Sequence, residues 1–317
     1  MSTNVSNETF GVRRVAIVGF GEAGSILGAD LVLAGCDVVT YDILLDEPHT
    51  AAAIRAKAER ARVRTAGTLA EAVTNADLII SAVTASSSGD VAALAAKSLR
   101  SGQVFLDINS VSPAKKQSSC ATLETSGADY VEAAVMAPFP PLRLKVPMLL
   151  GGRRAATVAS ALLRLGLNAK AISAQIGVAS AVKMCRSVVI KGIESLAVES
   201  MMAARRFGAE EQVLASLNQT YPGMGWQKEL PDYLISRVAE HGRRRAAEMR
   251  EVAHTLKDVG IEPTMAVAIA ERQDRLIDAM DAKGLRYDPT TDFSWRELLD
   301  GLDDSSAEPL SLSVPPL

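Results

Sequence analysis

The sequence contains few residues of the kinds that mark disulfide-rich or metal-binding proteins. Its three cysteines, Cys36, Cys120 and Cys185, are odd in number and follow neither disulfide nor metal-ligand spacing. Its three histidines are scattered along the chain. We therefore expect reduced thiols, as in a cytoplasmic protein, and no metal site.

Long apolar runs and a strong excess of one charge are also missing. No uncharged apolar run reaches the ~18 residues that a membrane helix needs. The first residues, MSTNVSNETFG, lack the basic start and apolar centre of a signal peptide. The formal net charge is −3, which gives no indication of nucleic-acid binding. We expect a cytoplasmic protein with a small-molecule substrate and no membrane or nucleic-acid partner.

Aromatic residues make up only 4% of the chain, whereas apolar residues in total make up 48%. Small and branched apolar residues suit helices that pack closely on a parallel sheet. A length of 317 residues favours two domains of ordinary size. The sequence therefore predicts an α/β fold with room for a second domain.

Strand and helix patterns alternate through the first half of the chain. Apolar β-branched runs at 13–18, 37–41, 77–83 and 103–108 are typical of buried parallel strands. Helical patterns separate them, and the last crossover helix ends near residue 167. We predict a doubly wound Rossmann domain over residues 13–174, with no strand after residue 172.

The second half is helical by pattern. Residues 176–208 contain no proline and are apolar nearly all round, so we expect a long central helix. We predict an all-helical substrate and dimerisation domain over 175–302, a disordered leader over 1–12 and a loose tail over 303–317. Because the domain is rich in alanine and poor in aromatics, we expect it to complete its core in a homodimer.

A glycine-rich segment follows the first strand and opens the first helix. It reads G-x-G-x-x-G and comprises Gly19, Phe20, Gly21, Glu22, Ala23 and Gly24. In such a segment the first glycine makes a tight turn and the second lets the backbone approach a pyrophosphate. The third allows close packing, and the helix N-terminus attracts the phosphates. The segment predicts a dinucleotide site.

Asp42 ends the second strand, where its carboxylate can accept hydrogen bonds from the adenosine ribose hydroxyls. The same charge would repel a 2′-phosphate. The sequence therefore favours NAD over NADP as the cofactor, although Arg55 and Arg60 stand where they could approach the adenosine.

The order of these motifs over about residues 13–210 resembles the β-hydroxyacid dehydrogenase superfamily, which includes 3-hydroxyisobutyrate and 6-phosphogluconate dehydrogenases. The segment 241–260, HGRRRAAEMREVAHTLKDVG, resembles the phosphogluconate-dehydrogenase-like branch whose C-terminal domain has no assigned role. The resemblance implies a Rossmann domain, a helical second domain and NAD(P)-dependent oxidation of an alcohol.

The resemblance also assigns roles to two loops and one turn. Val83 and Thr84 match the family loop that passes over the cofactor, and Asn109 matches a segment that contacts cofactor and substrate. The family's substrate loop falls on Met136 and Ala137, without its serine and paired glycines. We expect backbone amides there to donate to the substrate instead.

Lys183 matches the lysine that the family uses as acid and base, after a turn at Gly177 that matches the family's glycine turn. The chemistry needs such a group because oxidation of an alcohol releases a proton together with a hydride. A lysine on a domain surface, with its stem on apolar neighbours, is the alternative structural interpretation.

Ser187 stands where the family carries a substrate-binding asparagine, and Lys191 and Glu194 follow on the same helix face. These side chains either line a cleft, with Lys191 binding the substrate, or form a surface ion pair. The run Arg243–Arg245 either clamps an anionic substrate group or, as we favour, is a solvated face answered by Glu240, Glu248 and Glu251.

We therefore predict an NAD(P)-dependent oxidoreductase acting on a hydroxy-acid-like alcohol or carbonyl, with Lys183 as general acid and base. Two alternatives stay open. One is an imine reductase of similar architecture, and the other is a non-catalytic NAD-binding sensor or scaffold protein.

Overall fold

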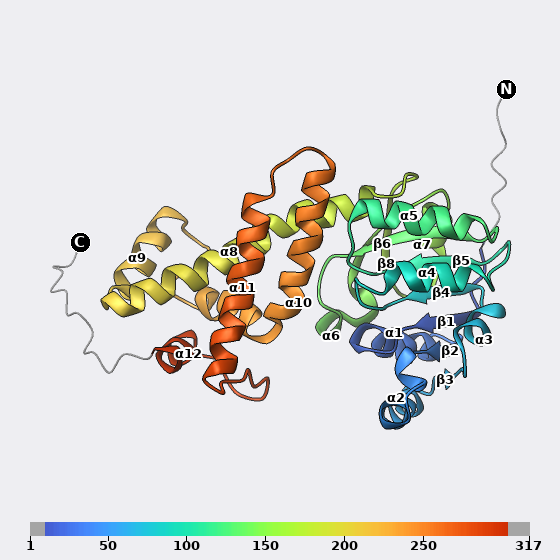
Figure 1. Ribbon diagram of the computed structural model, residues 1–317, viewed down its shortest axis with the longest axis horizontal. Helices are drawn as coiled ribbons and strands as arrows, with labels where there is room; N and C mark the ends of the chain where they lie inside the picture. The colour runs from blue at the N-terminus through green and yellow to red at the C-terminus, as the bar shows by residue number, and fades with distance from the viewer. Residues whose placement is uncertain (1–9, 304–317) are drawn as a thin grey trace. The chain divides into compact units, whose positions relative to one another are not determined.

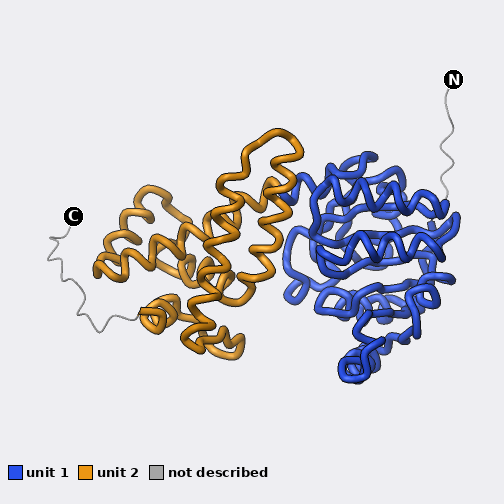
Figure 2. The backbone as a smooth tube through the Cα atoms, in the orientation of Figure 1, with its two compact units in different colours: residues 1–184 blue, residues 185–317 orange. Residues whose placement is uncertain are grey.

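The computed structural model describes residues 10–303, which form two compact units (Figures 1 and 2). The chain divides after Met184, inside helix α8 (Val178–Phe207). The sequence places the domain boundary between residues 174 and 175, before that helix. The division comes later because the backbone at the start of α8 is hydrogen-bonded to a residue of the sheet, Glu132.

The first unit is built on one eight-stranded sheet with the order β3-β2-β1-β4-β5-β6-β7-β8. Its strands are β1 (Arg14–Val18), β2 (Asp37–Tyr41), β3 (Arg64–Thr65), β4 (Leu78–Ser81), β5 (Val104–Asp107), β6 (Asp129–Val135), β7 (Pro147–Gly151) and β8 (Asn168–Ser173). The strand order reverses direction between β1 and β4. In a doubly wound sheet, ligands bind at this switch point, outside the carboxyl ends of the strands.

Helices cover both faces of the sheet, which confirms the doubly wound α/β fold (Figure 1). Alternate strand residues point to opposite faces, so Val15 and Ile17 enter one core cluster and Ala16 and Val18 the other. One face carries α1 (Glu22–Leu33), α2 (Pro48–Arg60), α6 (Phe139–Leu142) and α7 (Ala155–Arg164), and the other carries α3 (Leu69–Thr74), α4 (Ser88–Ala96) and α5 (Pro113–Glu124). Short 3-10 turns follow β2 and α6, at Ile43–Leu45 and Arg143–Lys145.

The far end of the sheet contains one antiparallel pairing and one strand that the sequence did not predict. Strand β7 runs antiparallel to β6, because the link between them holds only short helical turns and no crossover helix. Strand β8 pairs in parallel with β7 and was not predicted. Its residues, NAKAIS, lack the β-branched run that marks the other strands.

The second unit is helical throughout its described part, residues 185–303. After α8 come α9 (Glu210–Thr220), α10 (Leu230–Asp258), α11 (Thr264–Ala282) and α12 (Trp295–Leu302). Their apolar faces enclose a core that includes Val198, Ile235, Leu276 and Trp295. The predicted long central helix and all-helical second half are confirmed.

The predicted leader and tail fall largely on residues 1–9 and 304–317, which lie outside the described residues. The expectation is wrong for the end of the leader, because Phe10 is buried in the core of the first unit. Its carbonyl oxygen accepts a hydrogen bond from Arg164 at 2.8 Å, and the guanidinium of Arg154 lies over its ring. Among residues 10–303, no helix is both long enough and apolar enough to cross a membrane.

The glycine turn after β1 generates a stability prediction. A Cβ atom on Gly24 would lie 2.0 Å from the carbonyl oxygen of Gly19, whereas a Cβ on Gly21 would meet no atom within 4 Å. Gly24→Ala should lower the free energy of unfolding by about 1–3 kcal/mol through overpacking. Urea unfolding followed by circular dichroism measures this, with Gly21→Ala as the matched control. Equal effects of the two substitutions would contradict the packing argument.

Candidate active site

The turn between β1 and α1 has the geometry of a phosphate-binding loop. Gly19 has a φ of +92°, and a Cβ there would lie 2.4 Å from the carbonyl oxygen of Ala82, so this glycine allows the loop after β4 to approach. Gly24 packs against Gly19 in turn. Of the three glycines in this turn, Gly21 alone faces open space, which leaves room for a ligand to approach its backbone.

The N-terminus of α1 is not capped by a side chain. Gly21 occupies the N-cap position and makes no side-chain cap hydrogen bond. Amide groups of an uncapped first turn attract anions, so this end suits a pyrophosphate. The side chain of Phe20 is fully buried and contacts Gly28, so Phe20 presents only its backbone to the turn.

Asp42 lies beside this turn, as predicted for a ribose-binding carboxylate. Its two oxygens accept hydrogen bonds from the backbone amides of Phe20, at 2.6 Å, and Leu44, at 3.0 Å. Each carboxylate oxygen keeps a second lone pair that can accept from a hydroxyl. The two hydrogen bonds from backbone amides therefore hold the carboxylate in place and leave it able to accept further hydrogen bonds.

A lysine that sequence reasoning did not select also lies at the turn. Lys57 donates to the carbonyl oxygen of Phe20 at 3.3 Å, whereas Arg55 and Arg60 are exposed on the same helix. The spacing along the helix could have identified Lys57, because it lies one turn after Ile54, which is buried, on the same side of the helix. Arg60 lies a further turn away. Lys57 therefore brings a positive charge to the residue that Asp42 holds.

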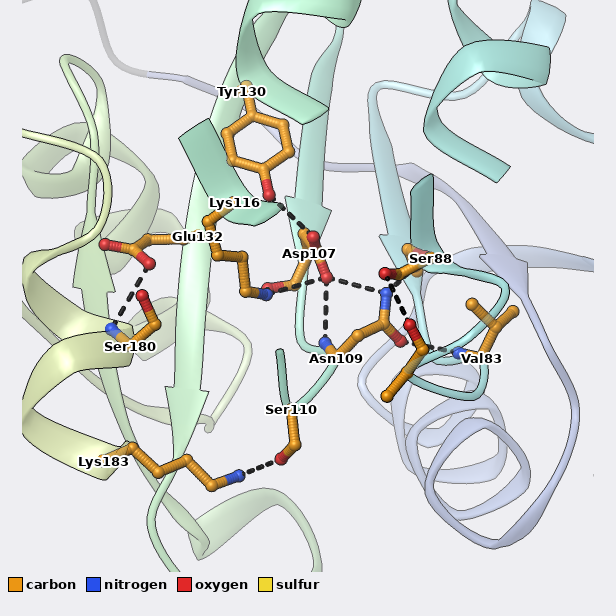
Figure 3. A network of polar contacts seen from close by, with 12 residues as sticks. Val83, Ser88, Asp107, Asn109, Ser110, Lys116, Tyr130, Glu132, Ser180 and Lys183 are labelled. Carbon is orange, nitrogen blue, oxygen red and sulfur yellow. Dashed lines mark hydrogen bonds and ion pairs between the residues drawn. The ribbon is translucent and has the colours of Figure 1, made fainter. Parts of the chain in front are cut away.

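Asn109 joins the loops that follow β4 and β5 (Figure 3). Its side-chain oxygen accepts from the amide of Val83 at 2.7 Å, and its side-chain nitrogen donates to Ser81 and Asp107 at 2.9 and 2.7 Å. Both amide hydrogens are therefore used inside the protein. The predicted substrate and cofactor contacts of Asn109 remain predictions, and only its oxygen is left to make them.

Beneath Asn109 lies a buried ion pair that sequence reasoning missed (Figure 3). The side chains of Asp107 and Lys116 are each 1% exposed, and Lys116 Nζ lies 2.8 Å from a carboxylate oxygen of Asp107. The hydroxyl of Tyr130 donates to the other oxygen at 2.6 Å. Burial, followed by the charge of Asp107, raises the pKa of Tyr130 well above its usual value, so the phenol stays protonated and keeps donating.

The predicted cofactor loop after β4 is held at two points. Val83 is fixed through its amide by Asn109, and the hydroxyl of Thr84 lies 3.0 and 2.9 Å from those of Ser86 and Ser87. The loop is therefore hydrogen-bonded to the loop after β5 at one end and, through Thr84, to the residues just before α4 at the other. Its contact with a cofactor remains a prediction.

A second buried carboxylate, that of Glu132 on β6, binds the start of α8. It accepts from the backbone amides of Gly177 and Ala179 at 2.7 and 3.0 Å. It also accepts from the amide of Ser180 at 3.3 Å (Figure 3). A negative charge at a helix N-terminus is favoured by the free amides and the helix dipole. Gly177 turns the chain into the helix with a φ of +105°, a conformation that glycine adopts readily.

Lys183 follows on α8, within the first unit. Its Nζ donates to the hydroxyl of Ser110, which directly follows Asn109 in the loop after β5 (Figure 3). Ser110 is thus a further candidate site residue that sequence reasoning did not select. The contact places the side-chain nitrogen of Lys183 beside the loop that follows β5.

The predicted substrate loop is a different case. The amide of Met136 donates to the carbonyl oxygen of Pro147 at 2.9 Å, which extends the pairing of β6 with β7. This amide is not available to a substrate. The expectation that the Met136 amide donates a hydrogen bond to the substrate is therefore wrong. Ala137 is partly buried against the core, and its substrate contact stays a prediction.

In the second unit, Ser187, Lys191 and Glu194 are all buried. Lys191 pairs with Glu248 at 2.5 Å, and Glu194 pairs with Arg245. The alternative in which Lys191 and Glu194 form a surface ion pair is therefore wrong, and the alternative in which they line a cleft stays a prediction. Burial lowers the pKa of Lys191, against the effect of Glu248, and burial raises the pKa of Glu194, against the effect of Arg245.

Arg243 and Arg244 are exposed, in agreement with the favoured solvated face, but the expected ion-pair partners are wrong. The alternative, a clamp on an anionic substrate group, stays a prediction. Arg243 pairs with Asp278 at 2.5 Å and Asp281 at 3.2 Å on α11, and Arg245 pairs with Glu194 on α8. The partners are therefore not the glutamates of the same helix, because neighbouring helices bring acidic residues closer. The predicted substrate contacts of Ser187 and Lys191 remain predictions.

Two stretches of the chain match known domain families. Residues 14–138 match the NAD binding domain of 6-phosphogluconate dehydrogenase. Residues 204–276 match a domain of unknown function, DUF1932. The first stretch contains the glycine turn, Asp42 and the Asn109 network.

Three relatives match most of the chain, and none has an assigned activity. A conserved hypothetical protein from Sinorhizobium meliloti 1021 is 36% identical over 93% of this chain and 97% of its own, with a TM-score of 0.74. A conserved protein of unknown function, whose structure reveals similarity with 3-hydroxyacid dehydrogenases, is 31% identical over 84% and 97%, with a TM-score of 0.67. An uncharacterized 28.5 kDa protein of Methanothermus fervidus is 26% identical over 79% and 96%.

More distant structures share the fold. Mycobacterium tuberculosis 3-hydroxyisobutyrate dehydrogenase is 17% identical over 92% of this chain and 99% of its own, with a TM-score of 0.69. Streptomyces aurantiacus imine reductase is 18% identical over 92% and 99%, with a TM-score of 0.52.

The Asp107–Lys116 pair generates a second prediction. Lys116→Met should lower the free energy of unfolding by about 3–5 kcal/mol, because it leaves a buried carboxylate without its counter-charge. Urea unfolding measures the loss, and Lys115→Met on the exposed side of α5 is the control. Adding Asp107→Asn to Lys116→Met should recover part of the loss. A double variant less stable than Lys116→Met alone would refute the charge argument.

Proposed function

Since the chain belongs to the β-hydroxyacid dehydrogenase superfamily, in a branch with a C-terminal domain of unknown function, we propose that it transfers hydride between a nicotinamide cofactor and a hydroxy-acid-like alcohol or carbonyl. The observation that carries the proposal is the contact of Lys183 with Ser110 at the edge of the sheet that also holds the glycine turn. Strands β1, β4 and β5 are parallel neighbours, so their carboxyl ends meet there.

The residues of the turn fit a dinucleotide. Gly21 leaves space for the pyrophosphate, and the backbone amides in the first turn of α1 can donate hydrogen bonds to it. The carboxylate of Asp42 can accept hydrogen bonds from ribose hydroxyls. These three features would hold the pyrophosphate and the adenosine, with NAD preferred because of the charge of Asp42. The nicotinamide, when bound, accepts or supplies the hydride.

Lys183 would move the proton. In oxidation, its neutral amine takes the proton of the substrate hydroxyl while hydride leaves the carbon. In reduction, its ammonium returns a proton to the oxygen as hydride arrives. Ser110 suits both states, because its hydroxyl accepts a hydrogen bond from the ammonium and donates one to the amine. The altered loop at Met136 and Ala137 favours a substrate other than 3-hydroxyisobutyrate or 6-phosphogluconate.

The cofactor preference is tested by thermal unfolding with NADH, with NADPH and without ligand. A ligand at ~100 times its dissociation constant stabilises by ~2.7 kcal/mol, and we expect this shift with NADH. Asp42→Asn should improve NADPH binding relative to NADH by roughly tenfold, since it removes one repelling charge. Asp37→Asn, at the other end of β2, is the control. A larger shift with NADPH in the unmodified protein would overturn the assignment of Asp42.

The role of Lys183 is tested by Lys183→Met in a screen of hydroxy acids and their carbonyl partners. We expect kcat to fall by ~10²–10⁴-fold while NADH binding is retained, because only the proton transfer is removed. Lys170→Met, on the exposed side of β8, is the control. Unchanged turnover would sink the lysine mechanism. Turnover of imines alone would support the imine reductase, and cofactor binding without any turnover would support a non-catalytic NAD-binding protein.

A further inference from the structure

Two opposite charges hold one residue of the glycine turn. The amide of Phe20 donates to the carboxylate of Asp42 at 2.6 Å, and the carbonyl oxygen of Phe20 accepts from Nζ of Lys57 at 3.3 Å. Among residues 10–303, neither Asp42 nor Lys57 forms an ion pair, with the other or with any third residue. A carboxylate and an ammonium group therefore flank the same residue, and neither charge is neutralised by a partner.

The adenosine ribose is the part of a dinucleotide that would lie beside these two charges. In a Rossmann domain the pyrophosphate lies at the N-terminus of the first helix, and the acid at the end of the second strand binds the ribose 2′-hydroxyl. Asp42 directly follows β2, and Lys57 contacts the residue that Asp42 holds. Both side chains are half-buried, so water and salt screen their charges less than at an open surface. The 2′ position therefore lies within the field of both charges.

The two charges act in opposite directions on a 2′-phosphate. The carboxylate of Asp42 repels it, whereas an ammonium group attracts it and can donate hydrogen bonds to its oxygens. A lysine has three N–H donors, and the carbonyl of Phe20 uses one of those on Lys57, so two remain. The flexible stem of lysine lets Nζ turn toward a ligand without leaving that carbonyl. The ribose of NAD carries a neutral hydroxyl at the same position and gains much less from the charge.

We propose that Lys57 is a second specificity-determining residue of the cofactor site, which offsets part of the repulsion between Asp42 and a 2′-phosphate. The site then prefers NAD by a narrower margin than Asp42 alone would set, and it accepts NADP as well. Arg55 and Arg60 are weaker candidates, because both are exposed and neither forms a hydrogen bond or ion pair with the turn in the described part of the chain. The proposal rests on the dinucleotide-binding part of the proposed function and not on the substrate or on Lys183.

The test is the ratio of the dissociation constants of NADPH and NADH, measured by fluorescence titration of the full chain. Lys57→Met should weaken NADPH binding by roughly tenfold and NADH binding by less than about twofold, because only NADPH carries the extra phosphate charge. Lys57→Arg keeps a positive charge with several donors and should keep the ratio within about twofold of wild type. Arg55→Met removes the same charge from the exposed side of α2. It is the matched control and should leave the ratio unchanged.

A double variant and the salt dependence separate the effect of charge from that of structure. Asp42→Asn with Lys57→Met should return the ratio to near its wild-type value, since the two substitutions change it in opposite directions. The effect of Lys57→Met should also shrink as salt is raised, because ions screen a charge that reaches solvent. An unchanged ratio in Lys57→Met, with or without a common loss of affinity, would refute the proposal and leave Lys57 a structural support of the turn. A wild-type protein that binds neither dinucleotide would instead refute the proposed function.

Discussion

The carboxylate of Asp107 lies almost wholly out of contact with water, and its environment must therefore neutralise its charge. Lys116 supplies the counter-charge, and Tyr130 and Asn109 supply hydrogen bonds. These groups come from α5, from β6 and from the loop after β5 itself. A charge that needs partners from three parts of the chain fixes those parts relative to one another.

The position of the site follows from that constraint. Asn109 is held by Asp107 and itself holds Val83 and Ser81, so the loops after β4 and β5 behave as one piece. This piece lies at the switch point of the sheet, beside the turn at Gly19. Because Ser110 directly follows Asn109, its hydroxyl is placed against Lys183 by the same network.

Glu132 solves the same problem with different donors. Its carboxylate is stabilised by hydrogen bonds from backbone amides at the start of α8 rather than by a cation. These hydrogen bonds fix the start of α8 on the sheet. Lys183 lies one turn further along the helix, so its position follows from Glu132, while that of its partner Ser110 follows from the Asn109 network. In the second unit, Lys191–Glu248 and Glu194–Arg245 relate α8 to α10 in an antiparallel register. Removing one partner of either pair would leave the other charge buried and unpaired.

The sequence by itself determined the features that depend on neighbouring residues. The glycine turn, Asp42 at the end of β2 and the long helix of residues 178–207 arise from contiguous strand, turn and helix signals, and all three were predicted. Strand β8 gave no such signal, because its residues form a strand only where β7 offers an edge. The Asp107–Lys116 pair, the binding of α8 by Glu132 and the use of the Met136 amide within the sheet were also decided by tertiary structure alone. Each depends on which polar groups lie close together once the chain has folded. Buried polar groups take hydrogen-bond partners by their distance in space, and the order of residues along the chain does not specify that distance.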